Sequence, residues 1–515
     1  MPRDCDVLIL GAGPTGLALA LWLAHFGVRL RIVDQAPEPG TTSRALVIHA
    51  RILEFYEQIG LAEEIVARGL KMGAANLWVA GRQRARLVFG DMGEGISPFP
   101  YALIFPQDEH ERLLIERLAA LGIAVERPVA AVGLAQCDDG VTARLRRADG
   151  GEETVEAHYV AGCDGTHSFL RTALDVGFPG GTYAHLFYVA DVEASGPAVN
   201  GELNLALDDA EFMAIFPLKG AGHARFIGTV KHEGEAQRDL TYADVSPRLV
   251  DRLGVSVVRV NWFSTYHVHH RVAVGFRRGR AFLLGDAAHI HSPVGGHGMN
   301  TGIGDAVNLA WKLAAVLQGR ADAGLLDTYE PERRAFARRL VATTDRTFQF
   351  VNNDGAIARA VRVRLVPVLL PALFRLPAMR RLMFRTVSQT NVNYRGSPIG
   401  LGAAGRITAG DRLPWLRQPD GTDNFAPLRA LAWHGQIRGE ASEETARACA
   451  EAGLALHRFP WSNAAGAAGF ARGAFYLVRP DGYIGLAASG EAGAIDEVTS
   501  PDDNLQAVFG YLVKQ

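Results

Sequence analysis

Blocks of apolar and polar residues near the N-terminus predict a strand, a helix and a second strand in succession. Residues 7–10 form a short, branched apolar run that is typical of a buried parallel strand. Residues 17–26 are apolar over a helical length, and Gly27 ends this run. A second strand is predicted over residues 30–33, directly before Asp34. This order predicts a βαβ unit within an α/β fold that is built on a parallel sheet.

Further along the chain the pattern changes to alternation with a period of two. Residues 202–207, 211–216 and 224–230 each alternate in this way. They lie in a region from about 176 to 264, for which we predict a mixed or antiparallel sheet. A long apolar stretch over residues 299–317 predicts a helix. The chain therefore combines a βαβ unit with an inserted sheet of another kind.

The composition narrows the classes of protein to which this chain can belong. Its 515 residues are 48% hydrophobic and 21% charged, which suits a globular protein of two or three domains. The formal net charge of -2 gives no general reason to expect nucleic acid or a membrane as a partner. No signal-peptide pattern precedes the first strand, and Pro367 and Pro371 interrupt the most apolar later run, so we expect a cytoplasmic protein. The four cysteines form neither a CxxC pair nor a zinc spacing, so no metal site is expected.

The loop after the first predicted strand reads Gly-Ala-Gly-Pro-Thr-Gly over residues 11–16. In a dinucleotide-binding turn, Gly11 permits the tight turn, Gly13 lets the backbone approach a pyrophosphate, and Gly16 lets the helix pack closely on the strand. The N-terminus of the helix supplies unpaired N–H groups for the phosphates. Asp34 stands where an acidic residue binds the hydroxyls of a ribose. The motif predicts a dinucleotide site without distinguishing NAD from FAD.

Two later segments point to the cofactor. Residues 159–171 read Tyr-Val-Ala-Gly-Cys-Asp-Gly-Thr-His-Ser-Phe-Leu-Arg, with Asp164 at the centre. Residues 280–289 read Arg-Ala-Phe-Leu-Leu-Gly-Asp-Ala-Ala-His, and residues 292–300 add closely spaced glycines before the long helix. These segments closely resemble the Asp-Gly and Gly-Asp motifs of the class A flavoprotein aromatic hydroxylases. Their order after the glycine loop is highly specific, and the resemblance implies FAD as the cofactor. In the tail, residues 410–414 and 478–484 resemble the thioredoxin-like domain of the phenol and polyketide hydroxylase branch of this family.

The chemistry of the second segment agrees with this resemblance. Residues 282–284 form a buried strand whose carboxyl end delivers Asp286 to the crevice where ligands bind in such sheets. A carboxylate there can accept hydrogen bonds from a ribityl chain, and the first N–H groups of the next helix stabilise negative charge on a reduced flavin. Carried over residue by residue, the motifs implicate in FAD binding Gly11, Gly13, Pro14, Thr15, Gly16, Asp34, Gln35, Arg44, Gln107, Asp164, Gly285, Asp286, Pro293, Gly296, Gly298, Met299 and Asn300.

The resemblance implies a Rossmann-like FAD-binding domain, an inserted substrate domain with a mixed β-sheet, and a thioredoxin-like C-terminal domain. We assign the FAD-binding domain to residues 1–175 and 265–395, with a helical segment on the substrate side at 340–395. The substrate-binding sheet then spans 176–264, and the tail spans 396–515. Thioredoxin chemistry needs a reactive CxxC pair, whereas the tail has a lone cysteine. We therefore expect the tail to be structural or to form a homodimer.

The resemblance also implies a reaction. In such monooxygenases NADPH or NADH reduces FAD, and the reduced flavin reacts with O2 to give a flavin hydroperoxide, which hydroxylates an electron-rich aromatic ring. The cofactor supplies the oxidising power, and the protein supplies orientation and a dry pocket. No phenol-activating base is identified in the sequence, and Pro293 and His297 are the candidates beside the flavin. Two alternatives stay open: a Baeyer–Villiger or epoxidising monooxygenase of the same family, and a flavoprotein that binds an aromatic pigment without turnover.

One strand suggests the substrate class. Residues 212–216 are apolar on both alternating faces, and we expect Met213, Ile215 and Phe216 to contact the substrate. A small aromatic acid would need a cation in the pocket, because burying an unpaired charge is costly. We therefore predict a bulky, mostly uncharged phenol or polycyclic polyketide-like substrate. Arg225, on the following strand, is the residue that could instead hold a carboxylate.

Overall fold

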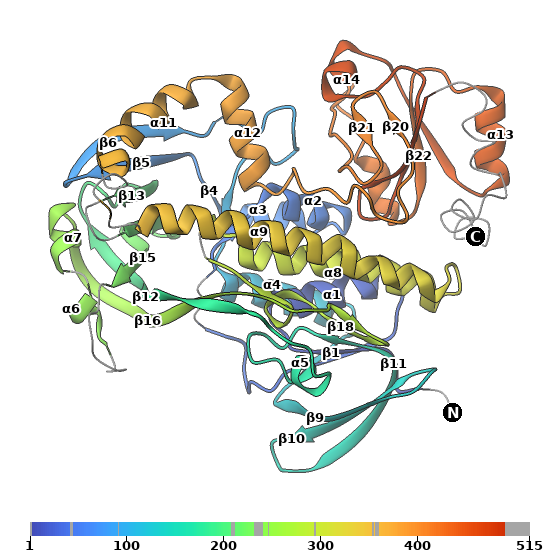
Figure 1. Ribbon diagram of the computed structural model, residues 1–515, viewed down its shortest axis with the longest axis horizontal. Helices are drawn as coiled ribbons and strands as arrows, with labels where there is room; N and C mark the ends of the chain where they lie inside the picture. Colours follow the sequence, from blue (N-terminus) through green and yellow to red (C-terminus); the bar gives the residue numbers. More distant parts are fainter. Residues whose placement is uncertain are drawn as a thin grey trace.

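The computed structural model (Figure 1) describes residues 3–41, 45–90, 92–207, 212–230, 240–245, 247–292, 295–352, 355 and 360–489. The N-terminal part forms one sheet, which we call the parallel sheet. It consists of β1 (Cys5–Leu10), β2 (Leu30–Val33), β8 (Val125–Glu126), β9 (Val129–Gln136), β10 (Val141–Arg147), β11 (Glu152–Gly162), β17 (Arg277–Arg278) and β18 (Ala281–Leu283). The strand order is β17-β18-β11-β1-β2-β8, and β10 and β9 extend it by antiparallel pairing. Because β1 lies between β11 and β2, Val7, Leu8 and Ile9 have no exposed surface.

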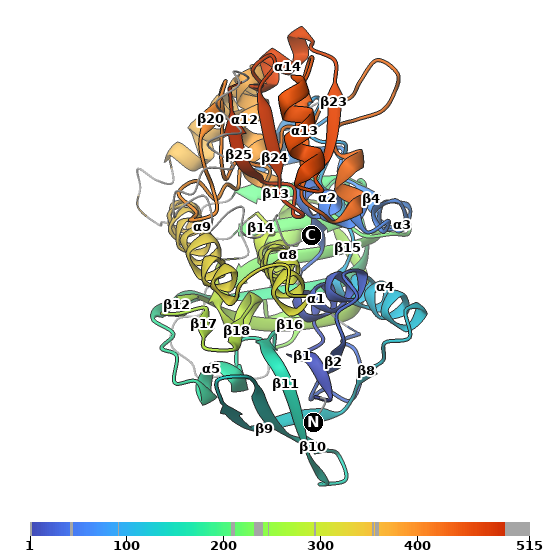
Figure 2. The same cartoon turned by 90° about the vertical axis from the view of Figure 1, so that its right-hand side faces the viewer.

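Four long helices lie beside this sheet: α1 (Pro14–His25), α4 (Gln107–Ala120), α8 (His297–Leu317) and α9 (Tyr329–Asn352). The helix α1 is apolar on all sides because it packs between α4 and α8, and Figure 2 shows α1 and α8 together at the centre of the molecule. Pro14 occupies the first turn, where its missing N–H costs nothing. Gly27, with φ of 72°, follows the C-terminus of α1. The helices predicted over 17–26 and 299–317 are thus confirmed, with each end within three residues of its predicted position.

The second sheet, which we call the large sheet, contains all three predicted alternating segments. In spatial order its strands are β19 (His289–Ile290), β16 (Ser256–Val272), β12 (Gly180–Ser195), β15 (His223–Val230), β14 (Phe212–Pro217), β13 (Leu203–Leu207), β5 (Ala74–Val79) and β6 (Arg82–Val88). The predicted boundaries of 176 and 264 are too narrow for this sheet. The strands β5 and β6 come from the N-terminal part of the chain, and β5 joins in parallel with β13, where Ala75 lies opposite Leu203.

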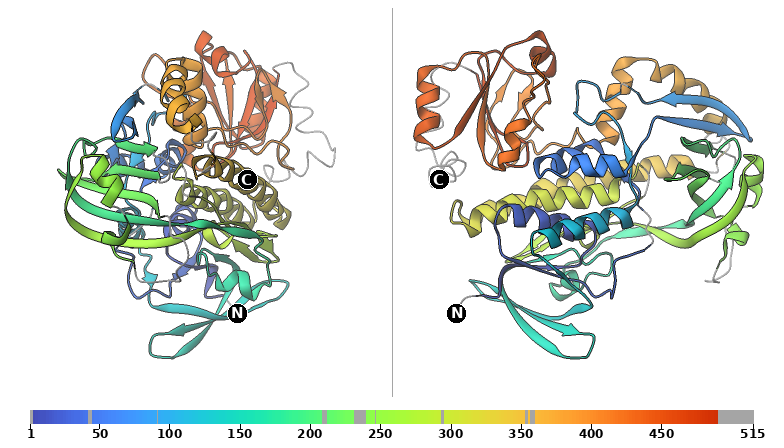
Figure 3. Two further views of the ribbon diagram at one scale, coloured as in Figure 1. Left: turned by 60° about the vertical axis from the view of Figure 1, so that its left-hand side comes forward. Right: turned by 180° about the vertical axis from the view of Figure 1, so that it is seen from behind.

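The helical segment predicted over 340–395 contains the end of α9, the π-helical turn η3 (Val361–Leu365), α11 (Val366–Phe374) and α12 (Pro377–Val387). Phe374 and Phe384 pack against Leu77 and Leu87, so these helices cover the hairpin of β5 and β6 (Figure 3). Among the described residues, no helix is long and apolar enough to cross a membrane.

The C-terminal part forms a four-stranded mixed sheet that lies apart from the other two sheets in Figure 1. Its elements are β20 (Ala403–Ala404), β21 (Ile407–Thr408), η4 (Ala426–Ala430), β22 (His434–Arg438), α13 (Glu443–Glu451), β23 (Ala455–Phe459), α14 (Asn463–Ala468), β24 (Phe475–Val478) and β25 (Ile484–Ala488). The order is β23-β22-β24-β25, with β22 and β23 parallel. Cys449 on α13 is buried beside Ile437 and Phe475, as a structural thiol would be. The thioredoxin-like character of this domain stays a prediction, and residues 490–515 lie outside the described residues.

Short elements connect these bodies. They are β3 (Val47–Ile48), α2 (Ala50–Gln58), α3 (Ala62–Arg68), β4 (Leu70–Lys71), β7 (Leu103–Ile104), α5 (Phe169–Ala173), α6 (Tyr242–Val245), α7 (Pro247–Arg252), η1 (Gly285–Ala287) and η2 (Ala323–Thr328).

Candidate functional site

The motif residues meet at one edge of the parallel sheet. The strands β2, β1, β11 and β18 are neighbours and run parallel, so their carboxyl ends lie at the same edge. Gly11 directly follows β1, and Asp34 directly follows β2. Asp164 and Gly285 each lie two residues beyond the ends of β11 and β18. Ligands of such sheets bind outside the carboxyl ends of the strands, so this edge is the candidate site.

The three glycines of the first motif have different surroundings. Gly11 has φ of 100°, and a β-carbon on it would lie 2.3 Å from the carbonyl oxygen of Cys163. A β-carbon on Gly16 would lie 2.0 Å from the carbonyl oxygen of Gly11. Among the described atoms, nothing lies within 4 Å of a β-carbon on Gly13. Gly11 and Gly16 therefore serve the packing of the loop, and Gly13 borders open space.

Thr15 connects the first motif to the Gly-Asp motif. A β-carbon on Gly285 would lie 2.6 Å from the Thr15 Oγ1 atom, and one on Gly302 would lie 2.2 Å from it. The start of α1, the turn η1 and the helix α8 therefore converge on this hydroxyl. Pro14 and Thr15 lie in the first turn of α1, which is where the sequence predicts phosphate binding.

Asp34 ties the glycine loop to the end of β2. Its Oδ2 atom accepts a hydrogen bond from the Ala12 N–H at 2.6 Å, and its Oδ1 atom accepts one from the Ala36 N–H at 2.8 Å. The Arg127 guanidinium lies 3.3 Å from Oδ1. The carboxylate thus orders the loop within the protein, and its contact with a ribose stays a prediction, as does that of the exposed neighbour Gln35.

Asp164 has an unused acceptor. Its Oδ2 atom accepts from the Leu170 N–H at 3.0 Å, whereas its Oδ1 atom is buried and has no hydrogen-bond partner among the described residues. Burial raises the pKa of this carboxyl group above its ordinary value. A buried acceptor without a partner is rare in native proteins, so a donor from a bound group would suit this position.

The Gly-Asp segment leads into an uncapped helix start. Asp286 is exposed within a segment that is otherwise buried. The helix α8 begins after Gly296, which adopts a left-handed conformation with φ of 66° and has no side chain to cap the helix. The first-turn N–H groups, including those of Gly298 and Met299, therefore leave a positive potential that suits an anion.

Asn300 has a role within the protein. It has no exposed surface, and its Nδ2 atom donates to the carbonyl oxygens of Val47 and Gly296, both at 2.8 Å. Its Oδ1 atom accepts from the His49 N–H at 2.8 Å. The side chain that the sequence places beside the cofactor is thus occupied in fixing the first turn of α8 to β3 and α2.

Three histidines surround this helix start, of which His49 and His297 are buried and His291 is half-buried. The rings of His49 and His297 lie 5.0 Å apart between centroids, and the Gln389 Nε2 atom lies 3.3 Å from the His297 Nδ1 atom. Burial lowers the pKa of His49 and of His291 to about 4 and holds the pKa of His297 well below its ordinary value. At neutral pH these imidazoles are neutral, so they add no fixed charge to the site. His49 belongs to no motif of the sequence, which is why it escaped prediction.

The predicted substrate contacts lie on two faces of the large sheet. Met213 and Ile215 are buried in a cluster with Val250 of α7. Phe216 has the opposite orientation, because side chains alternate along a strand, and it packs in a cluster that includes Val47 beside α8. The three residues therefore cannot line one pocket together. The same cluster also contains Leu205, Phe212, Ala214 and Ile227 of the large sheet, which the sequence did not single out as contacts.

Arg225 lies on the same face as Phe216 but is already paired. It is 2% exposed, its Nε atom donates to Asp191 Oδ1 at 2.6 Å, and its Nη2 atom donates to Asp191 Oδ2 at 2.7 Å. Its guanidinium also lies 5.8 Å from the centroid of the Trp262 ring. Asp191 on β12 is directly opposite Arg225 in the strand register. The positive charge that could hold a substrate carboxylate is thus neutralised within the protein.

Three further residues, Gln107, Arg44 and Pro293, are predicted to lie beside FAD. Gln107 begins α4, its Nε2 atom donates to Glu111 Oε1 at 2.7 Å, and its N–H donates to the Ala45 carbonyl oxygen at 3.1 Å. Arg44 and Pro293 lie outside the described residues. Their predicted places beside the flavin stay predictions.

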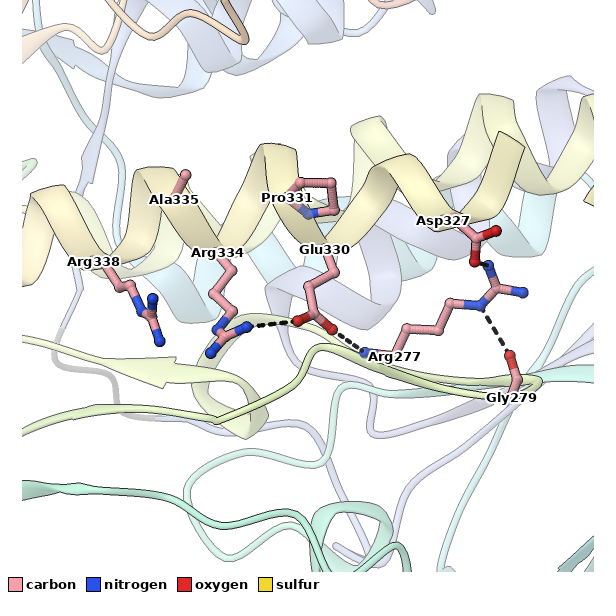
Figure 4. Close-up of a pocket in the computed structure, with 8 residues that line it drawn as sticks. All are labelled: Arg277, Gly279, Asp327, Glu330, Pro331, Arg334, Ala335 and Arg338. Atoms are coloured by element: carbon pink, nitrogen blue, oxygen red, sulfur yellow. Dashed lines mark hydrogen bonds and ion pairs between the residues drawn. The ribbon is translucent and has the colours of Figure 1, made fainter. Parts of the chain in front are cut away.

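A separate cleft lies between α9 and the hairpin of β17 and β18 (Figure 4). Its lining side chains pair with one another: Arg334 donates to Glu330 at 2.7 Å, and Arg277 donates to Asp327 at 2.5 Å. The Glu330 carboxylate also accepts from the Arg277 N–H at 3.3 Å. These contacts fix α9 to the hairpin that leads into the Gly-Asp motif, and they place no motif residue in the cleft.

The carboxyl edge offers the features that a dinucleotide requires. Within the described part of the chain, open space borders Gly13, Asp164 has an unpaired buried acceptor, and no side chain caps the first turn of α8. Together they provide a close backbone approach for a diphosphate, an acceptor for a donor group, and N–H groups for an anionic ring edge.

Several known proteins are similar to this chain in sequence and in fold. A family described as "FAD binding domain" matches residues 4–344. The 6-methylpretetramide 4-monooxygenase of Streptomyces rimosus is 37% identical over 420 residues, which cover 79% of this chain and 74% of that protein. The 12-dehydrotetracycline 5-monooxygenase/anhydrotetracycline 6-monooxygenase of Streptomyces rimosus subsp. rimosus is 33% identical over 98% of this chain and 99% of its own length. The solved structure of an anhydrotetracycline hydroxylase from Streptomyces rimosus is similar with a TM-score of 0.76 and 30% identity, over 98% of this chain and 99% of that one.

Proposed function

Because this chain belongs to the FAD-binding-domain family and is an FAD-dependent aromatic monooxygenase, we propose that its substrate is a bulky, uncharged, polycyclic phenol. The main evidence for this substrate class is the bidentate ion pair between Arg225 and Asp191. Because of this pair, the arginine has no free charge with which to bind a substrate carboxylate. The relatives that are named for 6-methylpretetramide and anhydrotetracycline support the same class.

Within this function we assign the carboxyl edge of the parallel sheet to FAD. Gly13 would admit the diphosphate, the free oxygen of Asp164 would accept a hydrogen bond from the cofactor, and Asp286 would accept one from the ribityl chain. The first turn of α8 would stabilise negative charge on the bound flavin. When bound, FAD supplies the redox and oxygen chemistry, and these residues bind it, orient it and exclude water.

The substrate class can be tested by removing the counter-charge of Arg225, which is the Asp191 carboxylate. In Asp191→Asn the guanidinium keeps a hydrogen-bond partner but loses its counter-charge, so a carboxylated aromatic should bind more tightly than it does to the wild type. We expect KM for a hydroxynaphthoic acid to fall by about tenfold, with little change for the matched naphthol, because a charged hydrogen bond contributes about 1.5–3 kcal/mol. Steady-state O2 uptake with both compounds measures the two values.

Glu193 provides the control for this experiment. It lies on β12 two residues after Asp191, and it forms an exposed ion pair with Arg259. Glu193→Gln removes one carboxylate from the same strand and should leave the ratio of the two KM values unchanged. A wild-type enzyme that prefers the acid, with a preference lost in Arg225→Ala, would contradict the proposed substrate class.

We further propose that the chain is a single-component enzyme that accepts a hydride from NADPH or NADH and then uses O2. The resemblance to the class A aromatic hydroxylases supports this, because it implies a transient site for the nicotinamide, and the sequence contains no second glycine-rich dinucleotide loop. Anaerobic bleaching of the flavin by each nucleotide, in the absence of any reductase, tests it. A product NMR spectrum separates ring hydroxylation from ring-bond insertion of oxygen or epoxidation, and substrate-stimulated O2 uptake separates an enzyme from a pigment-binding flavoprotein.

A further inference from the structure

One helical surface combines exposed apolar side chains with arginines. It is carried by η3, α11 and α12, and we call it the α11 face. Its large apolar side chains are between 40% and 67% exposed, and they account for half of the exposed large hydrophobic residues of the described chain. They are Leu365, Val368, Leu369, Leu373, Leu376 and Leu382. Exposed apolar patches of this density mark interaction sites in soluble proteins.

Three of these side chains lie on one side of α11. Leu369 and Leu373 are four residues apart on this helix, and Val368 adjoins Leu369 on the same side. Leu365 ends η3 directly before α11, and Leu376 lies between α11 and α12. The opposite side of the helix is used in the fold, since Pro367 and Phe374 are buried and Phe374 packs against the hairpin of β5 and β6. The helix is thus apolar all round, a pattern that fits burial on both sides.

Positive charge surrounds this apolar side. The arginines at 364, 375, 381 and 385 are exposed, and in the part of the chain that the structure describes they form no ion pair. The sequence from 355 to 410 contains no Asp or Glu at all. The chain as a whole has a formal net charge of -2, so the acids that balance these arginines lie elsewhere. The partner of the α11 face should therefore be both apolar and anionic.

We propose that the α11 face docks on the surface of a lipid bilayer that contains anionic phospholipids. The leucines enter the boundary between headgroups and acyl chains, and the arginines pair with lipid phosphates. A second copy of this chain fits less well, because a two-fold contact would bring the same arginines of both copies together. The face is available to a flat surface, since its six large apolar side chains are exposed and α11 lies at an outer edge of the molecule in Figure 1. The formal net charge of the whole chain does not reveal this local excess of positive charge.

Flotation of the FAD-loaded full chain with vesicles tests the proposal. The wild type should float with vesicles of phosphatidylcholine and phosphatidylglycerol, should not float with phosphatidylcholine alone, and should detach as salt is raised. The double substitution Val368→Asp/Leu369→Asp should lower the partition coefficient at least about tenfold, and so should Arg375→Glu/Arg381→Glu at low salt. All four substituted side chains are exposed, so both variants should keep their flavin and circular dichroism spectrum.

Two matched controls lie elsewhere on the surface. Val258 on β16 is 77% exposed, and the Arg447 side chain on α13 is 69% exposed. Val258→Asp and Arg447→Glu should bind anionic vesicles as the wild type does. Failure of the wild type to bind them, or equal binding by the α11 variants, overturns the proposal. A dimer in light scattering that Val368→Asp/Leu369→Asp dissociates also overturns it, because the face then belongs to a second copy of the chain.

Discussion

Replacing Gly13 by valine should separate cofactor binding from folding. Among the described atoms, none lies within 4 Å of a β-carbon at this position, and the backbone angles of φ -78° and ψ -176° are open to valine. Gly13 is the N-cap of α1, where valine is less favourable than glycine. We therefore expect the free energy of unfolding of the apoprotein to fall by only about 1 kcal/mol.

The affinity for FAD should change far more. The valine side chain would stand where the diphosphate meets the loop backbone, and hydrogen bonds to a charged group contribute about 1.5–3 kcal/mol each. Loss of two such bonds raises Kd on the order of 100-fold or more. At a free FAD concentration about 100 times the wild-type Kd, the cofactor then adds about 2.7 kcal/mol to the stability of the wild type and less than about 0.5 kcal/mol to that of the variant.

Flavin fluorescence titration and urea unfolding of the apoprotein measure the two quantities separately. Gly16→Ala is the contrasting variant, because its β-carbon would lie 2.0 Å from the Gly11 carbonyl oxygen and the backbone would have to move. It should lose apoprotein stability as well as FAD affinity. The assignment of the diphosphate to Gly13 is refuted if Gly13→Val binds FAD within about threefold of the wild type, or if it destabilises the apoprotein as much as Gly16→Ala does.

Three further outcomes follow from buried groups. Arg479→Met leaves Glu332 and Asp481 buried without their shared cation, so urea unfolding should show a loss of about 3–5 kcal/mol, and a loss below about 1 kcal/mol would contradict the pairing. Burial lowers the pKa of Lys312 from 10.5 to about 8, so the unfolded state binds more protons between these values and stability should rise with pH there. Relative to Lys312→Met, the free energy of unfolding of the wild type should rise by about 1.5 kcal/mol between about pH 8 and 9.5, whereas parallel pH profiles of the two proteins would exclude this titration. Cys449→Ala should leave substrate-stimulated O2 uptake unchanged, because a lone buried thiol has no dithiol partner, and a large loss of activity would overturn the structural interpretation of the tail.

The elements around the flavin motifs could be predicted because their signals are local. A glycine loop between an apolar strand and an apolar helix is a short-range pattern, and the parallel order of the strands brings the later motifs to the same edge. The separate roles that the motif predicts for Gly11, Gly13 and Gly16 agree with the surroundings of each glycine, although the sequence holds no distances. Only the structure shows that Gly11 and Gly16 are in close backbone contact while Gly13 borders open space.

The substrate side could not be predicted in the same way, because its pattern carries no information about direction. Both faces of β14 are apolar, so alternation alone cannot tell which face meets the parallel sheet. The structure turns Met213 toward α7 and Phe216 toward the other side. Asp191 neutralises Arg225 from 34 residues away, and β5 joins β13 from a distant part of the chain. Such pairings depend on the register of the strands, which cannot be predicted from a single sequence.

The C-terminal domain contributes to the order of the Gly-Asp motif through a buried chain of charges. Arg479 donates to both carboxylate oxygens of Glu332, at 2.7 and 3.1 Å. The next residue on α9, Arg333, donates to Asp305 at 2.6 Å, and Asp305 accepts from the Gly285 N–H at 3.0 Å. These five residues, Arg479, Glu332, Arg333, Asp305 and Gly285, are almost fully buried. Each buried charge is therefore compensated by its neighbour, and each hydrogen bond fixes the position of the next residue in the chain of contacts. The C-terminal domain therefore stabilises the Gly-Asp segment without any CxxC chemistry. Arg479 binds α9, and α9 in turn fixes the segment that carries Asp286.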